Sequence, residues 1–220
     1  MVSGLKTAAI SETKASARRR QLRDALVEAA ERTIEAEGLR GLKARELADK
    51  VGCAVGAIYN VVTDLDELIF AVSARTLAQL ESKLTEAGAT VRSEKPGIDG
   101  ALDRLVRLAL AYTDFAAAHT PRWRAVFDHQ PPPGRDIPDW YMADQLRLFG
   151  YVEEPLKALR PNDTPARRAL IARSLVSAVH GIVVLGLEEK LQLLPRPVLR
   201  EQVTLLVAAM GRGLVDQPAK

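Results

Sequence analysis

Hydrophobic positions recur at helical spacing along most of this chain. Between Leu22 and Ile34 the apolar side chains fall on one stripe of a helix, which predicts a helix over about 17–37. Gly38 follows directly, and a glycine at this position commonly ends a helix because it adopts the left-handed conformation without strain. The first predicted element is therefore a long amphipathic helix.

Residues 43–63 predict two short helices joined by a sharp turn. Leu47 lies on the apolar face of the first, and the second is expected over about 54–59. Gly52 falls between them and permits the positive φ that such a turn requires. Two short helices in this arrangement form the helix-turn-helix that enters the major groove of DNA.

Apolar residues recur at helical spacing to the end of the chain and predict further helices. Asp64 is expected to cap the first of them. Pro155 is expected to bend one of the others or to start a new helix. These helices are expected at about 64–87, 98–119, 140–159, 166–190 and 196–214. The chain is therefore predicted to be all-α.

The two last predicted helices, 166–190 and 196–214, carry apolar residues on more than one face. Such a wide apolar surface needs a partner. Two such pairs, one from each subunit, would form an isologous four-helix interface, so a homodimer is expected. The alternative is burial of both helices within one subunit.

Composition places the chain among soluble globular proteins, because 47% of its residues are hydrophobic and 27% are charged. No apolar run approaches the ~20 residues needed to cross a bilayer, so no membrane association is expected. No secretory signal is visible at the N-terminus. The single cysteine, Cys53, excludes an intrachain disulfide. A cytoplasmic protein is expected.

Positive charge is concentrated at the N-terminus. Residues 1–23 hold six basic residues against one acidic residue, although the net charge of the whole chain is only +3. A basic arm next to a helix-turn-helix can neutralise DNA phosphates. The alternative is a solvated tail that only aids solubility.

Catalytic and metal-binding patterns are missing from the sequence. His119, His129 and His180 lie far apart, and no zinc-ligand spacing, phosphate loop or nucleophile motif is visible. We therefore expect no enzymatic activity, no metal and no cofactor.

The run from Gly38 to Val72 resembles the DNA-binding region of the tetracycline-repressor (TetR) family. The matching positions are Arg45, Leu47, Ala48, Gly52, Gly56, Ile58, Tyr59 and Leu68. The sequence departs from the family pattern at Lys43 and Ala54, which replace capping Thr and Ser, at Leu65, which replaces a frequent Lys, and at Val61 and Val62. The Ser-, Thr-, Ala- and Gly-rich composition of the first residues predicts a disordered basic arm over 1–16. The resemblance implies a three-helix DNA-binding domain over 17–63 and a helical ligand-binding and dimerisation domain over 64–220.

The resemblance also implies a set of DNA contacts. In the family, the residue at the position of Arg45 contacts the DNA backbone or a base edge, and the residue at the position of Tyr59 reaches a phosphate. The alternative for Arg45 is a solvated charge on the helix. Asn60 could bond adenine or a phosphate, and its alternative role is a helix cap. The candidate DNA-binding residues are Arg18, Arg19, Arg20, Lys43, Arg45, Ala54, Val55, Ala57, Tyr59, Asn60 and Thr63. Ala54, Val55 and Ala57 carry no hydrogen-bonding side chain, so they would face thymine methyl groups or permit close approach.

The segment 175–182 resembles the C-terminal domain class named for a Trp-His-Gly signature, with Val176 in place of the Trp. Aromatic residues of this half could line a pocket, although a packed core is the alternative, and His180 could bind a ligand or be satisfied within that core. The candidate ligand-binding residues are Tyr112, Phe115, Trp123, Phe127, Trp140, Tyr141, Phe149 and His180.

The resemblance implies a ligand-responsive transcriptional regulator. We expect a homodimeric repressor that binds double-stranded DNA at a palindromic operator and is released by a small hydrophobic effector. The alternative is a DNA-binding architectural or partner-recruiting protein that responds to no ligand.

Overall fold

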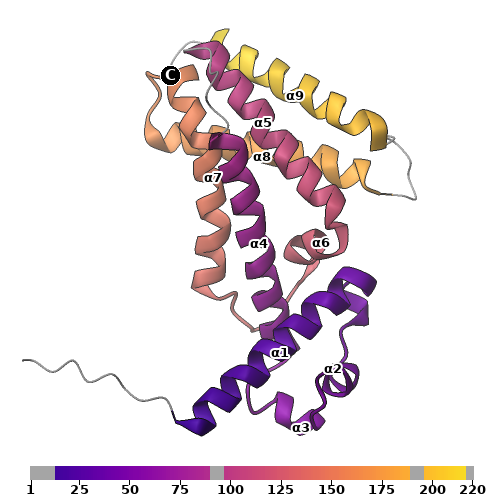
Figure 1. Ribbon diagram of the computed structural model, residues 1–220. Coiled ribbons are helices and arrows are strands. Elements are labelled where there is room, and N and C mark those ends of the chain that lie inside the picture. Colours follow the sequence, from indigo (N-terminus) through magenta and orange to yellow (C-terminus); the bar gives the residue numbers. More distant parts are fainter. Residues whose placement is uncertain (1–12, 90–96, 189–195, 217–220) are drawn as a thin grey trace, which may run out of the picture. The chain divides into compact units, whose positions relative to one another are not determined.

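The computed structural model describes residues 13–89, 97–188 and 196–216, which form helices and connecting segments with no strand among them (Figure 1). This confirms the predicted all-α fold. The chain divides into two compact units, Met1–Val72 and Ser73–Lys220. The elements are α1 (Lys14–Glu37), the 3-10 turn η1 (Leu39–Gly41), α2 (Ala44–Val51), α3 (Val55–Ile58), α4 (Leu65–Ala89), α5 (Ile98–Ala118), α6 (Thr120–Asp128), α7 (Asp139–Leu159), α8 (Pro165–Gly186) and α9 (Arg196–Asp216).

Helix α1 begins earlier than the apolar stripe predicts. The Thr13 hydroxyl oxygen accepts a hydrogen bond from the Ser16 N–H at 3.2 Å, so Thr13 caps a helix that starts at Lys14. The expectation of disorder up to residue 16 is therefore wrong for the last three residues, while 1–12 lie outside the described residues. Gly38 ends the helix as predicted, with φ 69° and its N–H bonded to the Ile34 carbonyl at 2.8 Å.

The helix-turn-helix forms with the predicted glycine turn. Gly52 has φ 75° and ψ 40°, and the N–H groups of Gly52 and Cys53 bond the Ala48 carbonyl at 2.9 and 3.0 Å. Helix α3 spans one turn only, Val55–Ile58, and is shorter than expected. The N-caps of α2 and α3 make no side-chain capping bond. Both short helices therefore depend on packing more than on capping.

Val61 and Val62 belong to the core. They follow α3 and are 9% and 3% exposed, so the unusually apolar end of the recognition segment faces the protein interior. With Ile58, Leu47 and the buried face of α1, they supply apolar area that holds α3 in place although its cap is missing.

Asp64 caps α4 as predicted, within a reciprocal pair of bonds. The Glu67 N–H donates to Asp64 Oδ1 at 2.9 Å, and the Thr63 N–H donates to Glu67 Oε2 at 2.8 Å. Arg23 of α1 donates to Glu67 Oε1 at 3.1 Å. Burial opposes ionisation of Glu67, but the bond from Thr63 and the Arg23 guanidinium together lower the pKa of its carboxyl. The start of α4 is thereby bonded to α1.

The C-terminal unit is a helical bundle in which α5 packs on α7 and α9, and α8 packs on α7 and α9. Its hydrophobic core runs from Leu80 of α4 to Val207 of α9. Pro155 lies inside α7, which continues through it to Leu159, so no separate helix starts there. Helix α8 ends at Gly186, earlier than residue 190, and α9 extends to Asp216.

Helices α8 and α9 approach each other closely at Gly186. A Cβ on this glycine would lie 2.6 Å from Leu199 Cδ1, which is too short for a real contact. A buried ion pair holds the other end, because Arg160 Nε donates to Asp163 Oδ2 at 2.8 Å and Arg160 Nη1 donates to the Leu214 carbonyl at 2.8 Å. The α8–α9 pair is therefore fixed at both ends.

Helix α8 is long and apolar enough to cross a membrane by length and composition alone. Arg173 and His180 interrupt its apolar residues, and such a helix is also found in the cores of proteins that cross no membrane. Only 28% of its most apolar window is buried. Its inner face packs in the bundle through Ala172, Leu175, Val179 and Val183. Leu170 and Leu185 are its large apolar side chains that are exposed.

Candidate functional site

A surface hollow in the N-terminal unit brings together residues from α1 and from the end of the helix-turn-helix. The residues that line it are Ala15, Arg18, Arg19, Leu22, Ala57, Tyr59, Asn60 and Val61. Five of the predicted DNA-binding residues thus lie around one concave surface. Arg18 and Arg19 are exposed and form no ion pair with any residue in the described part of the chain. Their guanidinium groups are free to bind phosphate.

The recognition segment presents small and apolar groups followed by two polar ones. Val55 is 39% exposed, and Ala54 is exposed at the N-cap of α3. Tyr59 is 51% exposed, and the Asn60 side chain is exposed without a hydrogen bond to the described residues. A tyrosine hydroxyl and an exposed amide can bond phosphates or base edges, whereas Ala54 and Val55 can only make apolar contacts.

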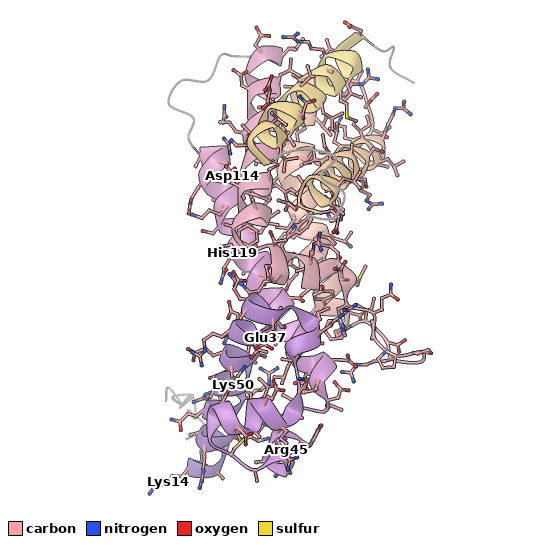
Figure 2. The ribbon with its side chains drawn as sticks, turned by 90° about the vertical axis from the view of Figure 1, so that its right-hand side faces the viewer. Lys14, Glu37, Arg45, Lys50, Asp114 and His119 are labelled. Atoms are coloured by element: carbon pink, nitrogen blue, oxygen red, sulfur yellow. The ribbon has the colours of Figure 1, made fainter. Side chains whose placement is uncertain are left out.

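Helix α2 carries three basic residues in different surroundings. Lys43, at its N-cap, donates to Glu46 at 2.8 Å, and this bond raises the pKa of the Lys43 ammonium. Lys50 donates to Thr33 Oγ1 at 2.8 Å and lies 3.9 Å from Glu37. Figure 2 labels Lys50, Glu37 and Arg45. Arg45 is exposed and has no ion pair within the described ranges. Arg45 is therefore the cation of α2 that is available to an external anion.

Six predicted residues do not line the hollow: Arg20, Lys43, Arg45, Ala54, Val55 and Thr63. Arg20 is exposed on α1 but does not line it. Thr63 is exposed, and its backbone N–H is already bonded to Glu67. The side chain of Thr63 also bonds the Glu67 carboxylate and helps to lower its pKa.

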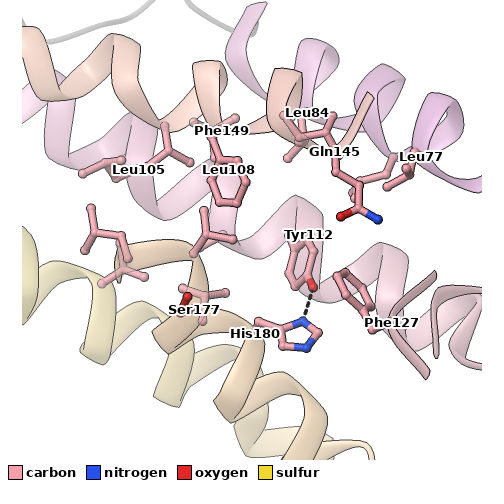
Figure 3. A pocket seen from close by; sticks show the side chains of 18 residues that line it. Leu77, Leu84, Leu105, Leu108, Tyr112, Phe127, Gln145, Phe149, Ser177 and His180 are labelled. Carbon is pink, nitrogen blue, oxygen red and sulfur yellow. Dashed lines mark hydrogen bonds between the residues drawn. The ribbon is translucent and has the colours of Figure 1, made fainter. Parts of the chain in front are cut away.

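The C-terminal unit contains a cavity of about 290 Å³ between six helices. Figure 3 shows it from close by. Its walls come from α4, α5, α6, α7, α8 and α9. The lining residues are Leu77, Leu80, Leu84, Leu105, Leu108, Ala109, Tyr112, Phe127, Gln145, Leu148, Phe149, Val152, Leu175, Val176, Ser177, Val179, His180 and Val207. The volume is close to the lower end of the range for small-molecule sites, about 300 Å³.

A chain of hydrogen bonds fixes the polar side chains at this cavity. The Trp123 indole N–H donates to the Tyr112 hydroxyl oxygen at 3.0 Å, and that hydroxyl lies 2.7 Å from Nδ1 of His180 (Figure 3). An indole N–H can only donate, so the Tyr112 oxygen accepts from it and the hydroxyl proton is available for Nδ1. We therefore assign the neutral tautomer of His180, with its proton on Nε2.

Burial keeps this cluster uncharged. Desolvation raises the pKa of the Tyr112 phenol. Burial also lowers the pKa of His180 below 6.5, and the carboxylate of Asp128 opposes this shift only in part. Phe127 covers the imidazole, with the two ring centres 4.3 Å apart. At neutral pH the cavity therefore has neither a phenolate nor an imidazolium in its wall.

The structure separates the predicted ligand-binding residues into two groups. Tyr112, Phe127, Phe149 and His180 line the cavity. Phe115 and Trp123 are buried in the core, Tyr141 is buried with its hydroxyl donating to the Val126 carbonyl at 2.9 Å, and Trp140 is 49% exposed. Trp123 does not line the cavity, but its indole N–H bonds the hydroxyl of Tyr112, which does.

Sequence reasoning overlooked most of the cavity wall. The residues it did not select are leucines and valines of α4, α5, α7, α8 and α9, together with Ala109, Gln145 and Ser177. A leucine stripe looks the same in a sequence whether it faces a core or a cavity. Gln145 is the one available signal, because an uncharged polar residue precedes the apolar pair Leu148 and Phe149 on the inward side of α7.

The outer faces of α8 and α9 expose large apolar side chains. Leu170 and Leu185 of α8 are 61% and 44% exposed, and Leu205 of α9 is 63% exposed. Between Leu170 and Leu185 the outward positions include Ser174 and Gly181, which leave room for another helix to approach. An exposed apolar surface of this kind is typical of an interface with a partner.

Comparisons with known proteins agree with this arrangement. Residues 105–210 match the family described as tetracyclin repressor-like, C-terminal domain. A Rhodococcus sp. RHA1 protein of unknown function has a similar structure, with a TM-score of 0.70, 23% identity, and coverage of 96% of this chain and 100% of that one. No curated protein sequence matches the chain.

Two structures of TetR-family transcriptional regulators from Streptomyces coelicolor are also similar. One has a TM-score of 0.65 at 18% identity and covers 90% of this chain and 97% of that one. The other has a TM-score of 0.60 at 20% identity and covers 90% of each chain. The shared fold extends to the N-terminal unit, and the matched C-terminal domain occupies the bundle that holds the cavity. Residues 105–210 thus match the tetracyclin repressor-like C-terminal domain family, and the chain as a whole has the fold of TetR-family transcriptional regulators.

Proposed function

We propose that this protein is a homodimeric transcriptional repressor that leaves a palindromic operator when a small hydrophobic effector binds. The N-terminal unit would bind DNA, and the C-terminal unit would bind the effector and form the dimer. The observation that carries the proposal is the cavity, because a DNA-binding protein that responded to no ligand would gain nothing from 290 Å³ of unfilled apolar space in its second unit.

DNA binding would combine positioning on phosphates with apolar contacts in the major groove. Arg18, Arg19, Arg45 and Tyr59 are exposed and suited to phosphate or base-edge contacts. Ala54, Val55 and Ala57 would meet thymine methyl groups, and Asn60 is suited to an adenine edge. Two subunits related by a two-fold axis would read two half-sites, so the operator should be palindromic.

The dimer would form through the outer faces of α8 and α9. Leu170, Leu185 and Leu205 supply apolar area that no residue of the described chain covers completely. Pairing these helices with their symmetry mates would give a four-helix interface.

Helix α4 would transmit the signal. It starts immediately after the recognition segment, at Leu65, and farther along its length Leu77, Leu80 and Leu84 line the cavity. An effector that separates these leucines from α5 and α7 would favour a different position of α4. Such coupling requires that the effector prefer one arrangement, and it implies that operator DNA weakens effector binding by the same factor.

The test is binding of the purified protein to the DNA that flanks its own gene, over a range of salt concentrations. Arg45→Ala should weaken binding by about 10- to 150-fold if the guanidinium contacts a base edge, and Tyr59→Phe should weaken it by about 5- to 10-fold through loss of one hydrogen bond. Arg173→Ala is the matched control, because Arg173 is an exposed arginine of α8.

Equal losses in the Arg45 and Arg173 variants would mean that only overall charge matters, which contradicts operator recognition. The protein could bind DNA tightly through Arg45 and Tyr59 while no apolar compound changes its affinity for DNA. This result would favour the ligand-independent architectural protein instead.

A further inference from the structure

The cavity wall is almost entirely hydrocarbon. Among the residues described there, helices α4 to α9 supply leucine, valine, alanine and phenylalanine, and no Asp, Glu, Lys or Arg takes part. Asp128, whose carboxylate acts on His180, is not among the lining residues, so an ion that entered would lose its hydration and meet no opposite charge in the wall itself. Desolvation of an unpaired ion costs far more than any apolar contact returns.

The polar groups of the wall differ in what they can offer a ligand. The Tyr112 oxygen accepts from Trp123 and its proton faces His180 Nδ1, so this hydroxyl is already satisfied. Ser177 lies at an exposed position of α8. Gln145 interacts with the Tyr141 hydroxyl, which accepts, so the amide keeps its carbonyl oxygen and one N–H. Gln145 and Nε2 of His180 are thus the groups that remain.

These polar groups gather at one end. Figure 3 shows Gln145, Tyr112 and His180 close to Phe127, whereas Leu105 lies at the opposite end. Tyr112 and Leu105 are two turns apart on α5, which corresponds to about 10 Å along the helix axis. The cavity therefore extends over about two turns of α5, with Gln145, Tyr112 and His180 at one end and, apart from the exposed Ser177, apolar side chains along the rest.

We propose that the cavity selects a neutral ligand with an elongated apolar body and one uncharged oxygen group, such as an alcohol, ketone or ester, placed at the Gln145 end. This rests on the proposed effector function and specifies its ligand. The amide of Gln145 bonds the oxygen group, and the aliphatic walls cover the body. Carboxylates and ammonium ions with the same body are rejected because the wall holds no counter-charge.

The loss of affinity expected for a charged ligand follows from its pKa. At pH 7.4 a carboxylic acid must take up a proton to enter in its neutral form, and its pKa lies about three units lower, which weakens binding about a thousandfold. An alkylamine must lose a proton across a similar interval and is weakened by about the same factor. Each methylene added to a neutral ligand should strengthen binding about fourfold until the cavity is full.

The experiment measures heats of binding of 1-octanol, octanoate and octylamine to the full-length protein without DNA. We expect 1-octanol to bind at least a hundredfold more tightly than either ion, and octanoate to bind about tenfold more tightly for each unit by which the pH is lowered toward its pKa. Gln145→Leu should weaken 1-octanol about tenfold. Gln202→Leu on α9, outside the cavity, is the matched control.

Each outcome decides one question. Octanoate or octylamine binding as tightly as 1-octanol would overturn the neutral-ligand assignment, and failure of all three compounds to bind would do the same. Equal effects of Gln145→Leu and Gln202→Leu, with both variants folded by circular dichroism, would overturn the placement of the oxygen group. Tight binding of 1-octanol that leaves the affinity for operator DNA unchanged would support the assignment and refute release by an effector.

Discussion

The proposed dimer interface makes a quantitative prediction at Leu205. Its side chain is 63% exposed on the outer face of α9. Complete burial of a leucine is worth about 2 kcal/mol, so covering this exposed part contributes about 1.3 kcal/mol, of which an alanine would keep a small share. Leu205→Ala should therefore remove about 1 kcal/mol from each subunit.

Symmetry doubles the effect. A two-fold interface contains each residue twice, so the dimer should lose about 2 kcal/mol, which corresponds to about a thirtyfold increase in its dissociation constant. The monomer should stay folded, because alanine is a good helix former and Leu205 is not part of the core. The DNA-binding unit is unchanged, so its affinity for a single half-site should remain the same.

Sedimentation equilibrium over a range of protein concentrations measures this dissociation constant directly. Leu146→Ala is the control, since Leu146 is a leucine of α7 that is 49% exposed and lies outside the α8–α9 surface. A change of less than threefold for Leu205→Ala, or an equal change for both variants, would refute the assignment of the interface to α8 and α9.

Three further predictions concern the stability of the C-terminal unit. Tyr112→Phe leaves the buried Trp123 N–H without its acceptor and should lower the free energy of unfolding by about 1–3 kcal/mol in urea titrations. The free energy of unfolding should fall as the pH drops below 6.5, because burial lowers the pKa of His180 and the unfolded chain therefore takes up the proton first. Urea titrations at pH 7.5 and 5.5 measure this fall, and it should be smaller in the His180→Gln variant. Gly186→Ala should be about 1–3 kcal/mol less stable in thermal unfolding than Gly150→Ala, since the first forces a Cβ against α9 and the second has open space around it.

Local signals predicted the DNA-binding unit well. The positive φ of Gly38 and Gly52 and the cap at Asp64 each depend on neighbours within a few residues, and the sequence contains those neighbours. The start of α1 was missed because the cap at Thr13 adds a turn that has no apolar stripe. The burial of Val61 and Val62 could not be predicted, because it depends on which residues pack against the segment that follows the one-turn helix α3.

The cavity could be predicted only in outline. Tyr112 and His180 are 68 positions apart, and their hydrogen bond exists only because α5 and α8 pack together. Trp123 and Trp140 are the same residue type in similar surroundings of sequence, yet one is buried and the other exposed. Spacing gives the apolar face of a helix, but whether that face meets a neighbour or a void depends on the volumes of side chains from several helices.

The two tryptophans give the protein an internal optical reporter. They are the only tryptophans in the chain, and Trp123 is 1% exposed whereas Trp140 is 49% exposed. Iodide in solution should quench the emission of Trp140 and leave that of Trp123. The remaining light comes from an indole whose N–H is bonded to Tyr112 in the cavity wall. A shift in this emission would therefore report occupancy of the cavity in the unlabelled wild-type protein.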